Sequence, residues 1–215
     1  MNRVIIFDFD GTIADTMPHV IDILQDLSTK YGYTKLSTNE IQKLQELSIR
    51  EIFKTLGVPF YKLPFIISDV KKMMREQILL VKPIDGISQE IHTLKKKSYS
   101  LGLITSNNKD IVLSFLKENN LDIFDYIYTG TSVFGKARAM QKFLEKYSLI
   151  NDQVIYIGDE IRDIEATQKV KIPIIAVTWG YNSHKGLAKY NPDYLVDKPE
   201  NLHEVIATVF AEKNT

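Results

Sequence analysis

Two aspartates stand directly after the first apolar run of the chain. Val4–Phe7 is followed by Asp8 and Asp10, and Gly11 and Thr12 come next. Aspartate is a poor strand former and is costly to bury without a partner, so this carboxylate pair needs an explanation. A chemical explanation makes Asp8 a nucleophile or metal ligand and Asp10 an acid and base. A structural explanation has Asp10 capping the turn at Gly11.

A second polar group closes the apolar run Leu101–Thr105. Thr105, Ser106 and Asn107 offer hydroxyl and amide groups that can donate hydrogen bonds to an anion, helped by the start of the next helix. The same residue types are also ordinary helix caps, so this group alone does not establish a binding site.

Charged residues mark two further places. Lys136 stands at the start of a predicted helix, where a cation opposes the helix dipole, although an exposed surface lysine is the simpler interpretation. Asp159 follows the apolar run Val154–Ile157, and Asp163 comes four residues later, so their carboxylates can lie one helical turn apart. With Asp8 they would offer the oxygen ligands that magnesium prefers; the structural alternative is that they cap the helix.

The four features together indicate one kind of chemistry. Magnesium-assisted phosphoryl transfer needs an acidic pair, groups that donate hydrogen bonds to an anion, a lysine and a second acidic pair. Each lies at the end of a predicted strand, and ligands bind at that edge of open parallel sheets. We therefore expect all four at one site.

The remaining sequence predicts the elements that hold these residues. Six short runs rich in Val, Ile and Tyr alternate with amphipathic stretches, and the runs are apolar throughout, as in strands buried on both faces. We therefore expect an α/β fold, with a Rossmann-like parallel sheet covered by helices on both faces. The expected strands are Val4–Phe7, Leu101–Thr105, Tyr126–Thr129, Val154–Ile157, Ile174–Val177 and Tyr194–Val196. The expected helices are Gly86–Lys97, Asp110–Asn119, Lys136–Tyr147, Asp163–Val170 and Glu200–Glu212.

One interval interrupts this alternation. Thr16–Val81 has helical spacing but no strand pattern, and two capping boxes, Ser37–Glu40 and Ser48–Glu51, predict the starts of helices. A further long helix is expected over Lys62–Leu80. The predicted domains are an α/β core of residues 1–15 and 82–215 and an inserted, all-helical domain of residues 16–81.

Composition argues against several other classes of protein. The 215 residues carry 27 Lys and Arg and 27 Asp and Glu, so the net charge is zero, and the absence of a long basic run argues against a nucleic-acid partner. Without cysteine there are no disulfides, thiolate zinc sites or cysteine nucleophiles. No stretch reaches the ~18 apolar residues of a membrane span, and Val4–Phe7 is too short for a signal-peptide core. We expect a cytoplasmic protein with no membrane partner; the sequence predicts no particular oligomeric state.

The sequence resembles the haloacid dehalogenase-like hydrolase superfamily, in particular its phosphoglycolate phosphatase and β-phosphoglucomutase branch. The helical block after the first strand is similar to the family's cap domain, and Val177–Tyr181 resembles its Val-x-Trp-Gly stretch. The family's four motifs are matched in order by Phe7–Thr12, which fits Asp-x-Asp-Gly-Thr, by Thr105, by Lys136, and by Gly158-Asp159 with Asp163.

The resemblance implies a mechanism. Asp8 would attack phosphorus and form an aspartyl-phosphate, while Asp10 would protonate the leaving oxygen and later deprotonate the hydrolytic water. The side chains of Asp8 and Asp159 and the backbone carbonyl of Asp10 would hold magnesium. Thr105 and Lys136 would bind the phosphoryl oxygens.

Three residues of the motifs add detail to the implied mechanism. Asp163 would orient Lys136 or the water shell of the metal. Glu160 stands where many relatives have Thr or Ser, and would either face solvent or contact the outer shell of the metal. Asp10 favours phosphate chemistry over carbon–halogen cleavage, because the dehalogenases that gave the family its name lack an acid at that position.

The resemblance also implies that the cap selects the leaving group. Arg50, Lys54, His19 and Lys43 are candidates to contact a second anionic group of the substrate. Arg50 comes first because it opens a helix after Ser48, where relatives often place a substrate-contacting residue. The expected reaction is hydrolysis of a small phosphorylated metabolite; a phosphomutase of the same fold and a catalytically idle binding protein are the alternatives.

Overall fold

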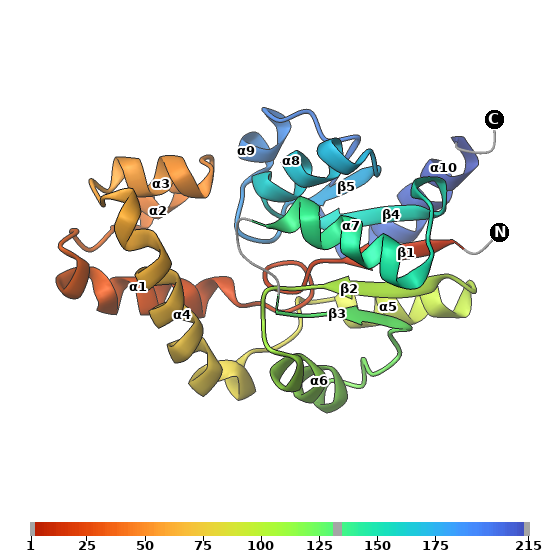
Figure 1. Ribbon diagram of the computed structural model, residues 1–215, viewed down its shortest axis with the longest axis horizontal. Helices are drawn as coiled ribbons and strands as arrows, with labels where there is room; N and C mark the ends of the chain where they lie inside the picture. Colours follow the sequence, from red (N-terminus) through yellow and green to blue (C-terminus); the bar gives the residue numbers. More distant parts are fainter. Residues whose placement is uncertain (1–2, 131–134, 213–215) are drawn as a thin grey trace.

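A parallel sheet forms the centre of the molecule (Figure 1). The computed structural model describes residues 3–130 and 135–212. Six strands lie in the order β3-β2-β1-β4-β5-β6, and each neighbouring pair is parallel. The predicted α/β class is confirmed, and every strand begins and ends within one residue of its predicted bounds. The strands are β1 Val4–Phe7, β2 Ser100–Ile104, β3 Tyr126–Tyr128, β4 Val154–Gly158, β5 Ile174–Val177 and β6 Tyr194–Val196.

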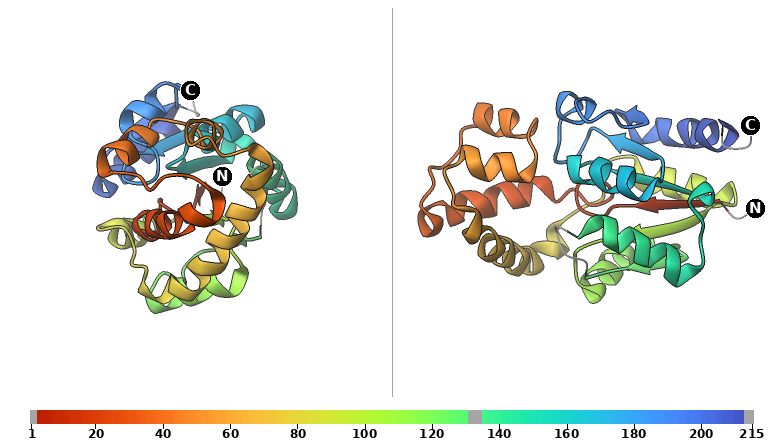
Figure 2. Two further views of the ribbon diagram at one scale, coloured as in Figure 1. Left: turned by 90° about the vertical axis from the view of Figure 1, so that its left-hand side faces the viewer. Right: turned by 45° about the horizontal axis from the view of Figure 1, so that its top comes forward.

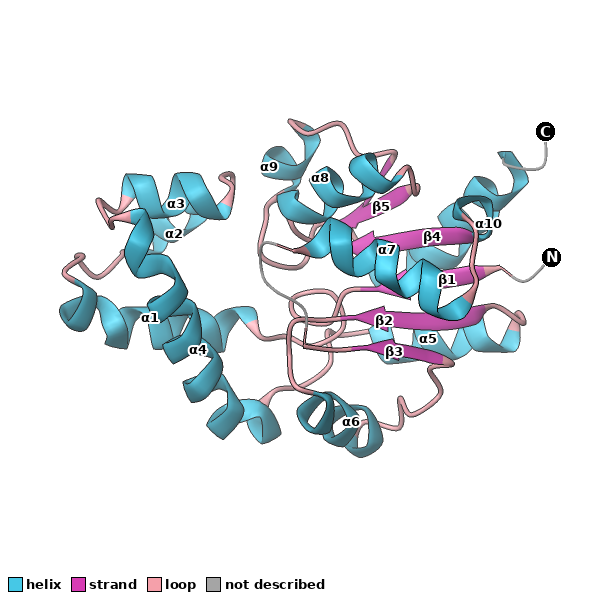
Figure 3. Ribbon diagram, in the orientation of Figure 1, coloured by secondary structure: helices cyan, strands magenta, loops and turns pink. Residues whose placement is uncertain are grey.

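Helices cover both faces of the sheet, because alternate strand residues point to opposite sides. On β1, Ile5 and Phe7 pack with helices α5, α6 and α10, whereas Val4 and Ile6 pack with α7 and α8. Figure 3 shows the strands between these two layers. The helices are α5 Ile87–Lys96, α6 Lys109–Glu118, α7 Lys136–Tyr147, α8 Ile161–Val170 and α10 Leu202–Glu212.

Residues 17–80, here called the helical insert, lie beyond the carboxyl ends of the strands (Figures 1 and 2). Both predicted capping boxes are present: Ser37 and Ser48 each accept a hydrogen bond from the backbone of the glutamate three residues on, and that glutamate bonds back. The expected helix over 62–80 is α4, with a 3₁₀ turn at either end. The insert comprises α1 Met17–Tyr31, α2 Thr38–Leu44, α3 Ile49–Thr55 and α4 Leu63–Gln77.

The two chain connections between core and insert pair with each other. Ala14 forms an antiparallel bridge with Pro83. The Asp15 amide donates to the Lys82 carbonyl at 2.9 Å, and the Ile84 amide donates to the Ile13 carbonyl at 2.8 Å. The insert therefore leaves and re-enters the core at one place.

A second contact joins the insert to the core through a helix that the sequence analysis did not predict, α9 His184–Ala188. The turn after α2 lies against it: Asn182 Nδ2 donates to the carbonyls of Gln45 at 2.8 Å and Leu47 at 3.0 Å. Two lysines of the core, Lys185 and Lys189, reach Glu46 in this turn at 3.0 Å each.

None of the helices in the described part of the chain is both long and apolar enough to cross a membrane.

Candidate active site

Side chains from four separate segments meet where the strands end. The Asp8 amide extends the sheet by donating to the Ile157 carbonyl at 2.8 Å. The Thr105 amide likewise donates to the Tyr128 carbonyl at 3.0 Å. Asp159 follows β4, Lys136 is the first residue of α7, and Asp163 lies in the first turn of α8. The parallel topology thus brings the ends of strands far apart in sequence to one edge.

Lys136 lies between two buried carboxylates. Its ammonium group forms ion pairs with Asp8 and, at 2.5 Å, with Asp163. Burial by itself would lower the pKa of Lys136, but the charges of Asp163 and Asp8 raise it above its usual value. Lys136 is therefore a fixed cation that touches Asp8.

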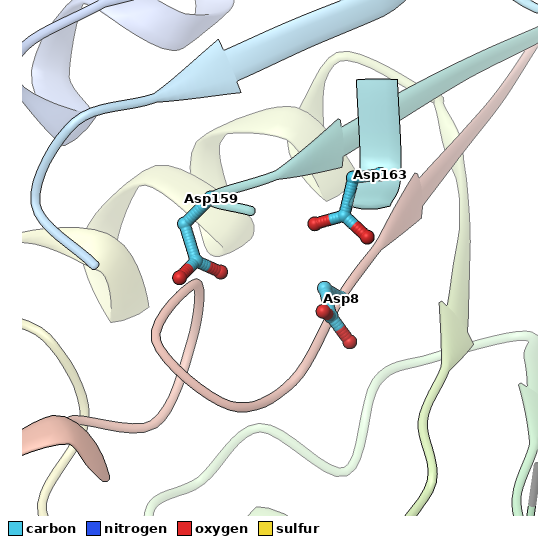
Figure 4. A group of neighbouring side chains, drawn as sticks. All are labelled: Asp8, Asp159 and Asp163. Carbon is cyan, nitrogen blue, oxygen red and sulfur yellow. The ribbon is translucent and has the colours of Figure 1, made fainter. Parts of the chain in front are cut away.

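Three buried aspartates form a possible metal centre. Asp8, Asp159 and Asp163 can each offer one carboxylate oxygen, and these oxygens lie within 4.8 Å of one another. Figure 4 shows the three side chains around one space. Asp8 follows β1, Asp159 follows β4, and Asp163 lies at the start of α8.

The charge balance of this cluster suits a divalent cation. Asp159 is fully buried and accepts hydrogen bonds from Thr12 Oγ1 at 2.6 Å and the Tyr181 amide at 2.7 Å, but within the described residues it has no cationic partner. Burial, together with the charges of Glu160, Asp8 and Asp163, raises its pKa well above the usual value. Buried charges are normally paired or bind metal, and carboxylate oxygens suit magnesium. These residues therefore fit the expected ion.

Asp10 lies in an environment suited to proton transfer. Asn107 Nδ2 donates to both of its carboxylate oxygens, at 3.1 and 2.9 Å. Burial and the charge of Asp8 raise the pKa of Asp10 to about 6, although the Asn107 hydrogen bond opposes them. A carboxyl group with a pKa near the operating pH can both give and take a proton.

A lysine of the insert, not predicted from the sequence, joins this site. Lys71 of α4 donates to the backbone carbonyl of Ser106 at 2.9 Å, and the Asn107 amide donates to Thr105 Oγ1 at 3.1 Å. Burial lowers the pKa of Lys71, while the charge of Asp10 opposes that shift. No local pattern distinguishes Lys71 from its neighbour Lys72, because only the packing of α4 selects the face toward the core.

The loop after β5 encloses Asp159. Trp179 Nε1 donates to the Thr12 carbonyl at 3.2 Å, and the Tyr181 hydroxyl contacts Thr16 at 2.9 Å. A methyl group at Gly180 would collide with the Asp159 carboxylate. This close approach gives a physical reason for glycine within the Val177–Tyr181 stretch.

Glu160 is turned toward its neighbour rather than fully into solvent. Arg162 Nη2 donates to Glu160 Oε1, and the two side chains are 22% and 15% exposed respectively. The Glu160 amide also donates to Asp163 at 3.1 Å. Glu160 thus helps to fix the start of α8 beside the carboxylate cluster.

The four residues suggested within the insert as contacts for a second anionic group do not reach this site. Arg50 is exposed, with its guanidinium 5.8 Å from the centre of the Phe60 ring. Lys43 and Lys54 are also exposed, and His19 Nδ1 contacts Gln77 at 3.2 Å. None of these four lines the cavity beside Asp10.

That cavity, of about 290 Å³, lies between the insert and the core. The core contributes polar and charged groups to its lining, among them Asp10, Ser106, Asn107, Glu160, Arg162 and Tyr181. Most of its other lining residues are apolar and come from the four helices of the insert.

Comparisons with known proteins agree with this geometry. The family model described as "Haloacid dehalogenase-like hydrolase" matches residues 5–177. The chain is 28% identical to the phosphoglycolate phosphatase of Synechococcus elongatus over 211 residues, 98% of this chain and 100% of that protein. It is 26% identical to pyrophosphatase PpaX of Listeria monocytogenes, over 94% of this chain and 95% of that protein. Among solved structures, a haloacid dehalogenase-like family hydrolase from Streptococcus pneumoniae superposes with a TM-score of 0.78 at 22% identity, covering 95% of this chain and 98% of that one.

Proposed function

Because the chain belongs to the haloacid dehalogenase-like hydrolase family, we propose that it is a magnesium-dependent phosphatase that hydrolyses a small phosphorylated metabolite through an aspartyl-phosphate. One observation carries the proposal: Asp8 contacts the fixed cation Lys136 and stands two residues from Asp10, an acid whose pKa is raised to about 6. Nucleophile, charge stabiliser and proton donor therefore share one pocket.

In the first step, a carboxylate oxygen of Asp8 forms a bond to phosphorus as the bond to the ester oxygen breaks. Asp10, protonated at the start, gives its proton to that leaving oxygen, so the product departs as a neutral alcohol. Lys136 and the hydroxyl of Thr105 bind the oxygens of the transferring phosphoryl group and offset their charge.

In the second step, water attacks the phosphorus of the aspartyl-phosphate. Asp10, now ionised, takes a proton from this water, and the bond from phosphorus to Asp8 breaks. Inorganic phosphate leaves, and both carboxyl groups return to their starting states. Asn107, which donates to both oxygens of Asp10, holds the carboxyl group in place for both transfers.

Magnesium would be held by the side chains of Asp8 and Asp159 and the backbone carbonyl of Asp10. When bound, it would neutralise charge on the phosphoryl group and on the aspartates around it. Asp163 pairs with Lys136 at 2.5 Å and so positions that lysine against Asp8.

The proposal is tested by a panel of phosphorylated metabolites incubated with the purified protein and magnesium, with released phosphate as the readout. Phosphate release that disappears in the Asp8→Asn variant supports the proposed function. Isomer formation without phosphate release would instead identify a phosphomutase. No turnover and no binding of any compound would contradict both enzyme proposals.

We predict that activity requires magnesium and that calcium inhibits it. Magnesium holds oxygen ligands in a tight octahedron, whereas calcium accepts looser and higher coordination, which would engage both oxygens of Asp8 and hinder its attack. Phosphate release should stop after exhaustive chelation, return with magnesium, and fall when calcium is added. Full activity in the chelated protein would contradict the assignment.

Lys71→Met should lower kcat/KM for phosphate esters by about ten- to a hundredfold, the usual range for losing one hydrogen bond from a charged group. The reason is that Lys71 reaches Ser106, beside the proposed phosphate position. Arg50→Met is the matched control within the insert, because Arg50 is exposed and does not line the cavity. A raised KM in Arg50→Met with normal kinetics in Lys71→Met would contradict this role of Lys71. It would instead support the sequence-based prediction that Arg50 contacts the substrate.

A further inference from the structure

We propose that the preferred substrate is a phosphate monoester of an apolar alcohol, whose hydrocarbon group the helical insert encloses. This inference rests on the proposed phosphatase function, and it replaces the second anionic group expected from the sequence with an apolar one.

The first argument is continuity between the reacting atoms and the cavity. Asp10, which would protonate the leaving oxygen, itself lines the cavity of about 290 Å³. A phosphoryl group bound at Asp8 would therefore direct its leaving group past Asp10 into this space. Small-molecule sites usually occupy roughly 300–1,000 Å³, so the cavity suits a group of modest size.

The second argument is the nature of the walls. All four helices of the insert contribute aliphatic side chains, including Ile21 from α1, Ile41 from α2, Ile52 from α3 and Ile67 from α4. These four isoleucines line the cavity and are partly exposed. Covering apolar surface that is in contact with water by an apolar ligand lowers the free energy of the system.

The third argument is the position of charge. Among the described residues that the insert contributes to the lining, the charged ones are Lys71 and Arg75. Both lie in the second half of α4, which leads back to the core, and Lys71 is bound to Ser106 beside the proposed phosphate position. The part of the cavity farther from the core thus offers no cation for a second anionic group, and burying such a group there unpaired would be unfavourable.

Calorimetry with n-alkylphosphonates, from methyl to hexyl, tests the inference without turnover, because a phosphonate carries no ester to break. With magnesium present, affinity should rise about fourfold for each added methylene until the cavity is full. The heat-capacity change of binding should become more negative along the series, as expected when apolar surface is buried. Equal affinity along the series, or no binding of any member, would overturn the inference.

Three variants locate the effect. Ile21→Gln keeps the side-chain size but places an amide in the wall, and it should flatten the dependence on chain length while methylphosphonate binding stays unchanged. Ile52→Gln, on a different helix, should act in the same way and serves if the first variant does not fold. Ile150→Gln is the matched control, because Ile150 is 55% exposed and precedes β4, at the opposite end of the sheet. An undiminished chain-length dependence in folded Ile21→Gln and Ile52→Gln would overturn the inference.

Turnover measurements separate this inference from the proposed function. If phosphoglycolate or glycerol phosphate is hydrolysed with higher kcat/KM than hexyl phosphate, the phosphatase proposal stands and the apolar substrate class is wrong. If phosphonates bind with the expected chain-length dependence but no ester releases phosphate, the apolar site stands and the proposed function is wrong.

Discussion

Replacing Asp8 with asparagine should lower phosphate release by several orders of magnitude while the protein still folds. The amide cannot attack phosphorus, so the covalent route is lost together with one oxygen ligand of the proposed metal. Folding should survive because Lys136, buried beside Asp8, keeps its partner Asp163. Removing one of three neighbouring buried carboxylates also relieves repulsion between them.

Rates from a phosphate-release assay and thermal unfolding curves measure the two parts of this prediction. Asp122→Asn is the matched control, since Asp122 belongs to the core and is exposed; its rate should equal that of the unmodified protein. Retention of more than about a tenth of the activity in Asp8→Asn would rule out Asp8 as the nucleophile, because nucleophile loss removes far more than this.

Asp10→Asn should slow both steps of the reaction by about 10²–10⁴-fold, the usual contribution of a positioned acid and base. The amide can neither protonate the leaving oxygen nor accept a proton from water. Magnesium affinity should change little, because the proposed contact is with the backbone carbonyl of Asp10 and not with its side chain.

Titration calorimetry with magnesium separates the roles of the two aspartates. Asp159→Asn should lose most of its magnesium affinity, since the carboxylate of Asp159 is fully buried in the cluster and lacks a cationic partner among the residues that the structure describes. Equal loss of affinity in Asp10→Asn and Asp159→Asn would show that the Asp10 side chain also binds the metal.

The sheet could be predicted because its signals are local. Each strand is a short apolar run followed by a polar or turn segment, and β1, β4 and β5 are buried throughout, whereas β3 is only partly buried. The starts of α2 and α3 were equally predictable, because a capping box needs only four consecutive residues such as Ser37–Glu40. Parallel topology then requires the ends of β1, β2 and β4 to share one edge, so Asp8, Thr105 and Asp159 could be expected together.

The parts that could not be predicted depend on contacts across the chain. Helix α9 is five residues long and too short for a periodic pattern, and it lies where Asn182 and Lys185 contact the turn after α2. The choice between Arg50 and Lys71 likewise depends on which faces of α3 and α4 turn toward the core. Burial of Lys71 beside Ser106 is a result of packing between two segments 35 residues apart.

Because Ala14 pairs with Pro83, the insert can be exchanged in evolution as a unit separate from the core. Seen from the sheet, residues 15–82 are the loop of a hairpin, and the ends of that loop are already held together by hydrogen bonds. A different set of helices, or a short turn, can replace residues 15–82 at this junction. The entropic cost of closing the loop would change little, because that cost rises only slowly with loop length. Under the proposed function, such a junction would let a lineage exchange the part that selects the substrate in one genetic event and keep Asp8, Asp10 and Asp159 unchanged.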